Sequence, residues 1–246
     1  TWHGGEAMTL VAGVRADYNT CYRKLLFAPR ATFRYNVTDD LILRLSAGRA
    51  FHSPHLLADN YGLFTSSRAN RHIKIDVPEL LPEDAVTFGG NLTWYLPFGY
   101  ENNTYVSAEY FGSRFLNQLY VDKEMADGGC YIYNTQGSKV FTNTFQLDFS
   151  SDLTEHFNLL ATLRYTNPKV SRRVTCDPEA ATQLVTVPMS SLFKAVVNAQ
   201  YKTNLSKWTF DATAQLNGPM RLPDYAAREW GMEQSPVYPM FYAQVT

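Results

Sequence analysis

The stretch FAPRATFRYNVTDDLILRLSAGRAFHSP, residues 27–54, decides how the chain folds. Two runs in it place apolar side chains at every second position: Pro29, Ala31, Phe33, Tyr35 and Val37, then Leu41, Leu43, Leu45 and Ala47. Arginines and small polar residues alternate with them, and the turn Thr38-Asp39-Asp40 joins the runs. Because successive side chains of a strand point to opposite faces, this pattern predicts a β-hairpin with one apolar and one polar face. A single hairpin does not decide which face meets water.

The same alternation recurs along the rest of the chain. It predicts ten antiparallel strands, at 8–18, 27–37, 41–48, 87–96, 104–115, 141–149, 157–166, 193–201, 208–217 and from 238 onward. Each offers about 9–11 alternating residues, which is enough to cross a bilayer at the usual tilt. We predict no long helix, only short helical turns such as those around 55–60 and 225–230.

The predicted connections alternate in length. Short polar turns lie around Asp39, Gly99, Asp152 and Asn204, and the other connections are the segments 19–26, 51–84, 122–129, 167–188 and 218–236. In an up-and-down meander this alternation places the short turns at one rim and the longer connections at the other. Bacterial outer-membrane barrels have this asymmetry, whereas soluble sandwiches and lipocalin-like barrels have no reason to keep it so regular.

The two predicted faces differ in a way that favours a membrane barrel. Large rings flank the short turns on the apolar face: Tyr35, Trp94, Phe149, Phe157, Tyr201 and Trp208. Rings at the strand ends with aliphatic residues between them form the interfacial girdle of such a barrel. The opposite face carries charges that a packed core would not bury, including Arg15, Asp17, Glu109, Asp148, Lys194 and Asp211. We expect this polar face to line water or a polar plug.

Composition narrows the class of protein. Charged residues make up 18% of the 246 residues, below the roughly 25% of soluble domains, and aromatic residues reach 14%. A net charge of −1 argues against a general nucleic-acid-binding surface. No stretch approaches the roughly 20 apolar residues of a spanning helix. Alternating barrel strands average to a polar mean hydropathy, here −0.27.

Cysteines and chain ends carry less information. Cys21, Cys130 and Cys176 include no CxxC pair, so neither a disulfide scaffold nor a zinc ribbon is predicted. One disulfide with a free thiol and three reduced thiols both fit. The chain begins at Thr1 without a leader and ends inside a strand-like run, so we expect a fragment or a mature piece of something longer.

No catalytic or metal-binding constellation emerges from the residues. His52 and His55 are separated by a Pro54 that breaks the helical presentation of metal motifs. The chain has no nucleophile elbow, P-loop or dinucleotide fingerprint. We therefore expect no enzyme activity, no metal site and no cofactor.

Two connections and one face hold candidate binding residues. Arg68, Arg71 and His72 could meet an anionic ligand such as a ferric chelate, or the phosphates of lipopolysaccharide, although a solvated loop is the plainer interpretation. Tyr225, Arg228 and Trp230 could present a stacking surface to a ligand. We expect the arginines of the polar face to hold a plug through ion pairs and hydrogen bonds: Arg30, Arg34, Arg44 and Arg164.

Several stretches resemble the TonB-dependent outer-membrane receptors, the large gated transporters of Gram-negative bacteria. LVAGVRADYN at 10–19, followed by residues 27–56, is similar to the family's strand ending in aspartate, its proline-arginine strand and its "GRGFRAP"-type strand end. LLPEDAVTFGGNLTWYLP at 80–97 resembles the family's "L-x-P-E" approach to the next strand, and 157–166 and 190–201 resemble later strands. Ala50 and His52 stand where the family often has Gly and Arg.

The resemblance implies an all-β, antiparallel transmembrane barrel of 22 strands around an N-terminal plug domain. Residues 1–246 would be a partial barrel domain from its C-terminal half, without the plug or the last strands. It further implies ligand-gated uptake of a scarce nutrient, such as a metal chelate, cobalamin or an oligosaccharide. Uptake would take place in the Gram-negative outer membrane, energised through TonB and in contact with lipid and lipopolysaccharide. Two rival hypotheses are a soluble β-barrel binding module and an outer-membrane enzyme.

Overall fold

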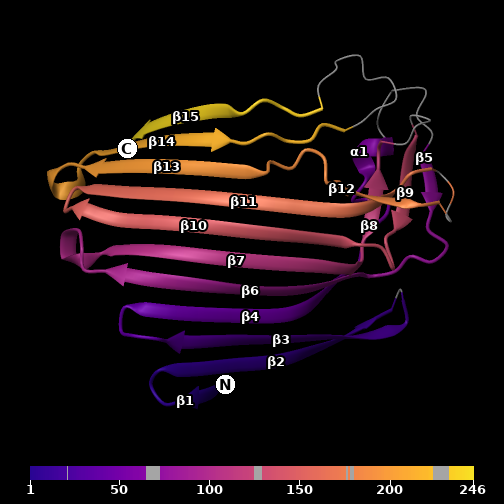
Figure 1. The fold of residues 1–246 in the computed structure, drawn as a ribbon, viewed down its shortest axis with the longest axis horizontal. Helices are drawn as coiled ribbons and strands as arrows, with labels where there is room; N and C mark the ends of the chain where they lie inside the picture. The colour runs from indigo at the N-terminus through magenta and orange to yellow at the C-terminus, as the bar shows by residue number, and fades with distance from the viewer. Residues whose placement is uncertain (21, 65–72, 125–128, 176, 178–179, 224–232) are drawn as a thin grey trace.

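The computed structural model describes residues 1–20, 22–64, 73–124, 129–175, 177, 180–223 and 233–246. Its main feature is one antiparallel sheet whose strands follow each other in chain order (Figure 1). The strands along it are β1 (Trp2–Gly4), β2 (Met8–Asn19), β3 (Lys24–Asn36), β4 (Leu41–His52), β6 (Glu83–Leu96), β7 (Thr104–Asn117), β10 (Val140–Thr154), β11 (Phe157–Arg173), β13 (Phe193–Lys202), β14 (Thr209–Asn217) and β15 (Tyr238–Val245). A further strand, β12 (Thr182–Thr186), pairs with the outer part of β11.

All ten predicted strands are confirmed, and their order is the predicted meander. The short turns lie together at one end of the sheet, the short-turn rim, and the longer connections lie at the other, the long-connection rim (Figure 1). Several strands extend beyond their predicted bounds: β4 runs to His52, β6 begins at Glu83 and β10 runs to Thr154. β3 begins at Lys24, and β11 runs on to Arg173 because Pro168 stays in register opposite Thr142 instead of ending the strand.

A second, smaller sheet stands at the long-connection rim (Figure 1). It consists of β5 (Ile73–Asp76), β9 (Cys130–Asn134) and β8 (Leu119–Asp122), with β5 and β9 parallel. The helical elements are short: α1 (Tyr61–Phe64), η1 (Tyr100–Asn102) and η2 (Asn204–Ser206). The helical turn predicted around 55–60 is confirmed, since the Asp59 backbone N–H donates to the His55 carbonyl at 2.9 Å, and α1 follows directly. The one at 225–230 falls outside the described residues. In the described part of the chain, no helix is both long and apolar enough to cross a membrane.

The register of the main sheet aligns side chains of one kind across neighbouring strands. Phe33 lies opposite Leu45, and Leu43 lies opposite Leu92, so the apolar face is continuous from strand to strand. Its side chains remain accessible; Trp94, for example, is 55% exposed. The fully buried apolar residues belong instead to the long-connection rim, where Ile132 and Val170 are 0% and 1% exposed. An apolar sheet face that stays open is what contact with lipid requires.

The main sheet does not close on itself. β1 pairs with β2 alone, and β15 pairs with β14 alone, within the residues that the structure describes. The sheet therefore has two unpaired edges among the described residues. Such edges offer free backbone donors and acceptors to further strands.

A close contact between β6 and β7 leads to a stability prediction. Gly112 lies opposite Phe88, and a β-carbon on Gly112 would lie 2.5 Å from the Phe88 ring. Gly112→Ala should therefore lower the free energy of unfolding by about 1–2 kcal/mol, because the ring must move. Denaturant titration of the detergent-solubilised protein measures it. Gly13→Ala is the matched control and should be neutral, since its nearest neighbour is 3.8 Å away. Equal stability of both variants would contradict the contact.

Candidate functional site

The polar face of the main sheet carries one continuous row of hydrogen-bonding side chains. Each lies opposite the next on the neighbouring strand, from β3 to β14: Arg34, Arg44, Asn91, Glu109, Gln146, Arg164, Lys194 and Asn217. The strand register creates the row, because every second residue of each strand is polar. The row lines the face that a barrel would turn toward its lumen.

Two hydrogen-bonded groups organise the row. In the first, Arg44 Nη1 donates to Asn91 Oδ1 at 3.5 Å and to Thr93 Oγ1 at 3.4 Å. Arg44, Asn91 and Glu109 also line a hollow of about 410 Å³. In the second, Arg164 Nε donates to Gln146 Oε1 at 2.9 Å, and Gln146 in turn donates to Asp148. The polar face is therefore ordered by its own side chains and still leaves space above them.

The four arginines that we expected on this face all lie there, but they do not form one cluster. Arg34 and Arg44 oppose each other on β3 and β4, whereas Arg164 lies on β11. Arg30 lies between two glycines, Gly13 and Gly48. No carboxylate of the described chain comes within ion-pair distance of these four guanidinium groups. Like charges that face each other on neighbouring strands are unfavourable, so Arg34 and Arg44 call for an anionic partner.

A second polar centre, the rim cluster, lies among the long connections. Glu124 accepts two hydrogen bonds from the Arg221 guanidinium, at 2.8 and 2.6 Å, and its carboxylate lies 3.3 Å from Arg172 Nη1. Arg173 forms an ion pair with Asp76 at 2.5 Å. These residues come from four separate connections or strand ends, and the Glu124 side chain is only 2% exposed. The rim cluster therefore fastens the connections to each other and is not open to a ligand.

Burial sets the ionisation of the rim cluster. Asp122 is fully buried, and its carboxylate lies 3.9 Å from Arg172 Nε without a hydrogen bond between them. Desolvation raises the pKa of Asp122. The Glu124 backbone N–H donates to the Asp122 carboxylate, and this hydrogen bond offsets part of the increase. Burial likewise raises the pKa of Tyr133 to about 12. The ion pair made by Glu124 is thus better formed than the one made by Asp122.

The structure does not place the candidate ligand residues of the connections. Arg68, Arg71 and His72, and also Tyr225, Arg228 and Trp230, lie outside the described residues. Sequence reasoning missed the rim cluster, since Glu124 and Arg221 are 97 positions apart and neither belongs to a motif. Among the residues with described positions, no group of three or more His, Cys, Asp or Glu could hold a metal ion.

An open antiparallel meander with an apolar face, a polar face and unequal rims defines the class: a segment of a β-barrel wall. Comparison with protein families then identifies which barrel. The family model for the TonB dependent receptor-like beta-barrel matches residues 1–238, so the chain belongs to this family. The match confirms the resemblance seen in the sequence. Among curated proteins, none matches the chain.

Solved structures agree on the fold. The ferric enterobactin receptor PfeA from Pseudomonas aeruginosa aligns with a TM-score of 0.68 at 11% identity, over 98% of this chain and 35% of that one. The copper transporter OprC aligns at 0.65 and 14%, over 99% and 38%. The ferric citrate transporter FecA aligns at 0.60 and 15%, over 97% and 35%. The chain therefore spans about a third of the length of these structures.

Proposed function

We propose that the chain forms part of the barrel wall of a ligand-gated transporter in the outer membrane of a Gram-negative bacterium. The transporter imports a scarce nutrient, and an inner-membrane complex energises it through TonB and a plug domain that these 246 residues do not include. The observation that carries the proposal is the pairing of an exposed apolar face with an ordered, cation-bearing polar face on one sheet. Lipid on one side and a polar lumen on the other account for both faces.

The uncompensated arginines support a role in the lumen. Arg34 and Arg44 face each other without a carboxylate partner in the described chain, and Arg30 has small neighbours on both sides. Carboxylates of a plug domain would complete charge-assisted hydrogen bonds with these groups. We therefore assign Arg30, Arg34, Arg44 and Arg164 to plug contact.

The proposed nutrient is an anionic metal chelate. Three solved structures of similar fold are named for ferric enterobactin, ferric citrate and copper, and the polar face of this chain carries arginines that would attract anions. Cobalamin and oligosaccharides remain alternatives within the same function. Contact with the ligand is proposed for the residues of the long connections: Arg68, Arg71, His72, Tyr225, Arg228 and Trp230.

Uptake by a deletion strain tests the function. A strain lacking the full-length protein should fail to grow when a ferric siderophore, ferric citrate or a copper complex is its sole source of the metal. Growth should return with the intact gene on a plasmid. If the deletion strain takes up metal chelates, cobalamin and oligosaccharides as well as the parent strain does, the proposed nutrient transport is rejected.

The lumen arginines give a sharper prediction. Replacing Arg34 and Arg44 together by Gln in the full protein should loosen the plug, because two charge-assisted contacts of about 1.5–3 kcal/mol each are lost. Cells should then admit large antibiotics that the outer membrane normally excludes. Minimal inhibitory concentrations measure the leak. The matched double variant, Lys202→Gln with Lys207→Gln at the short-turn rim, should leave exclusion intact. Normal exclusion and transport in the Arg34/Arg44 variant would refute plug contact.

The two rival functions have separate tests. A soluble binding module would be folded and monomeric in plain buffer, whereas the proposed barrel requires detergent because its apolar face is exposed. An outer-membrane enzyme would react with serine-directed hydrolase probes. We expect the full protein to need detergent and to stay unlabelled.

A further inference from the structure

Two arginines at the long-connection rim hold one carboxylate in the way that proteins hold a bound anion. Arg221 makes a two-point contact with Glu124, from Nη1 to Oε1 at 2.8 Å and from Nη2 to Oε2 at 2.6 Å. Arg172 Nη1 lies 3.3 Å from Glu124 Oε2 and donates to the Glu124 backbone carbonyl at 3.2 Å. A planar guanidinium fork of this kind recognises carboxylate and phosphate groups. The geometry is that of an anion site with its ligand in place.

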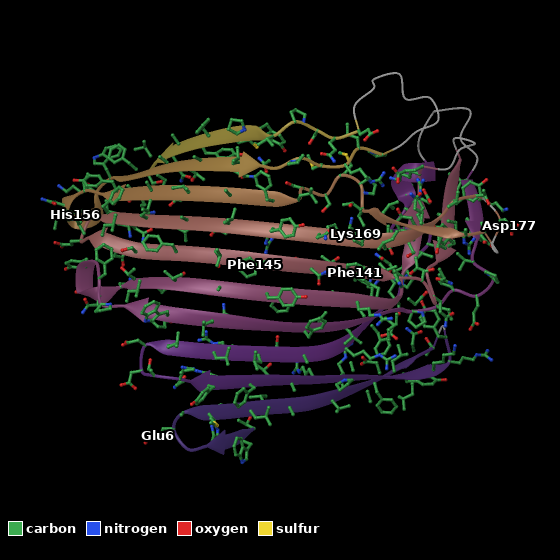
Figure 2. All side chains as sticks on the ribbon, viewed as in Figure 1. Glu6, Phe141, Phe145, His156, Lys169 and Asp177 are labelled. Atoms are coloured by element: carbon green, nitrogen blue, oxygen red, sulfur yellow. The ribbon has the colours of Figure 1, made fainter. Side chains whose placement is uncertain are left out.

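The carboxylate and the two arginines come from three separate parts of the chain. Glu124 follows β8, Arg172 lies in the outer part of β11, and Arg221 lies in the segment after β14. Figure 2 shows Lys169 and Asp177, which precede and follow Arg172 in the chain, toward the long-connection rim. A carboxylate on one segment is therefore clamped by cations on two others, and breaking the clamp would loosen the attachment of β8 to β11.

Contacts other than Glu124 fix the positions of both arginines. Arg172 lies opposite Gln183 in the β11–β12 pairing, and Arg221 Nε donates to the Thr186 carbonyl at 2.7 Å. Glu124 itself lies outside the named strands, on the connection that follows β8. The two guanidinium groups thus form a preorganised receptor beside β12, and Glu124 is the part of the contact that can be exchanged.

The neighbouring carboxylate does not saturate this receptor. Asp122 Oδ2 lies 3.9 Å from Arg172 Nε, and neither of these buried atoms forms a hydrogen bond within the described chain. A buried guanidinium N–H without an acceptor is unfavourable, so Arg172 retains a donor for a further oxyanion oxygen. A ligand with more acceptor oxygens than the Glu124 side chain could satisfy this donor as well.

We infer that Arg172 and Arg221 form an anion-binding site that Glu124 occupies as an internal ligand, and that a carboxylate of the imported nutrient displaces Glu124 from it. The inference rests on the proposed function, which brings an anionic nutrient to this rim. A tethered carboxylate acts at roughly millimolar effective concentration, so it keeps weakly binding anions out of the site. The contact is therefore autoinhibitory: the site opens to an anion that binds the two arginines better than Glu124 does.

Chemical rescue of Glu124→Ala in the full-length protein tests the site. Amide exchange in β8 and β9 should accelerate roughly a hundredfold, because a buried ion pair loses one partner. Acetate replaces the methylene and carboxylate that the substitution removes, and it should restore at least about tenfold of the lost protection. Acetamide has the same shape without the charge and should restore none. The matched control Glu79→Ala removes an exposed carboxylate from the same rim, and it should exchange like the wild type with or without acetate.

Two further measurements separate anion binding from a general loosening of the rim. In the double variant Glu124→Ala with Arg221→Gln, acetate should restore no protection, because half of the receptor is missing. The wild type keeps the test valid if Glu124→Ala fails to fold. Malonate should displace Glu124 in the wild type and accelerate exchange in β8 and β9 up to a plateau, whereas sodium chloride at equal ionic strength should not.

Three results would overturn the inference. They are no rescue of Glu124→Ala by acetate, equal rescue by acetamide or in the double variant, and unchanged exchange of the wild type in malonate. Nutrient uptake by the deletion strain is measured in parallel. Uptake that depends on the gene, without rescue by acetate, rejects the anion site alone. Rescue by acetate, without uptake that depends on the gene, supports the anion site and rejects the transporter.

Discussion

Val197→Arg should destabilise the membrane-embedded protein by about 2–4 kcal/mol, the cost of an arginine at the lipid-facing midplane of a β-barrel. Val197 lies in the middle of β13, is 46% exposed and has Ala161 and Ala214 as its outward neighbours. These neighbours, within the described sheet, offer no side-chain acceptor for the new charge. Equilibrium unfolding in lipid vesicles measures the loss, and reduced folded protein in the outer membrane accompanies it.

The adjacent residue supplies a matched control with the same change of side chain. Val196 points to the polar face, where it lies opposite Thr162 and Gln215. Val196→Arg should therefore cost less than about 1 kcal/mol, because the guanidinium remains in water. If both variants lose equal stability, or if only Val196→Arg is damaging, the assignment of the apolar face to lipid is wrong. The two variants carry the same substitution at consecutive residues of β13, so they differ only in the face of the sheet that the arginine occupies.

Glu124→Gln should loosen the long-connection rim by about 3–5 kcal/mol, the usual cost of breaking a buried ion pair by removing one partner. The substitution keeps the shape of the side chain but leaves Arg172 and Arg221 without their shared anion. Amide hydrogen exchange should accelerate in β8, β9 and the residues around Arg221. The strands of the main sheet should keep their protection, because their hydrogen bonds do not depend on the rim cluster.

Asp122→Asn is the matched control for that prediction. Because burial raises the folded-state pKa of Asp122 above its unfolded value, its ionised form weakens the fold. Its contribution to stability falls as the pH rises through the window between those two values, and Asn removes this dependence. Near neutral pH the variant should be as stable as the wild type or slightly more stable. Faster exchange in Asp122→Asn than in Glu124→Gln would contradict the description of the rim cluster.

Strand alternation could be predicted because it is a local property. The ten long strands each show an apolar residue at every second position, and the short turns carry Asp, Asn or Gly, so sequence alone predicted both the strands and their order. The small sheet could not be found in this way. β5 and β9 have four and five residues and pair in parallel across more than fifty positions, so neither leaves a periodic signal.

The residues of the candidate site were predictable only where local strand alternation determines their position. Arg30, Arg34, Arg44 and Arg164 were assigned to the polar face because parity alone determines the face. The rim cluster depends instead on which long connections meet after folding. These contacts leave no local pattern in a single sequence. The proximity of Arg114 and Lys169 was also overlooked, since both become neighbours of Phe141 only through pairing between strands.

The unequal connections also impose an order of assembly. Four hairpins, β3–β4, β6–β7, β10–β11 and β13–β14, close through short turns and so lose little chain entropy. Joining one hairpin to the next requires closure of a much longer loop, which is a slower event. The Glu124–Arg221 contact spans two of these hairpins, β10–β11 and β13–β14, and can form only after they have docked. Its formation therefore reports that β10, β11, β13 and β14 have assembled into one continuous part of the wall.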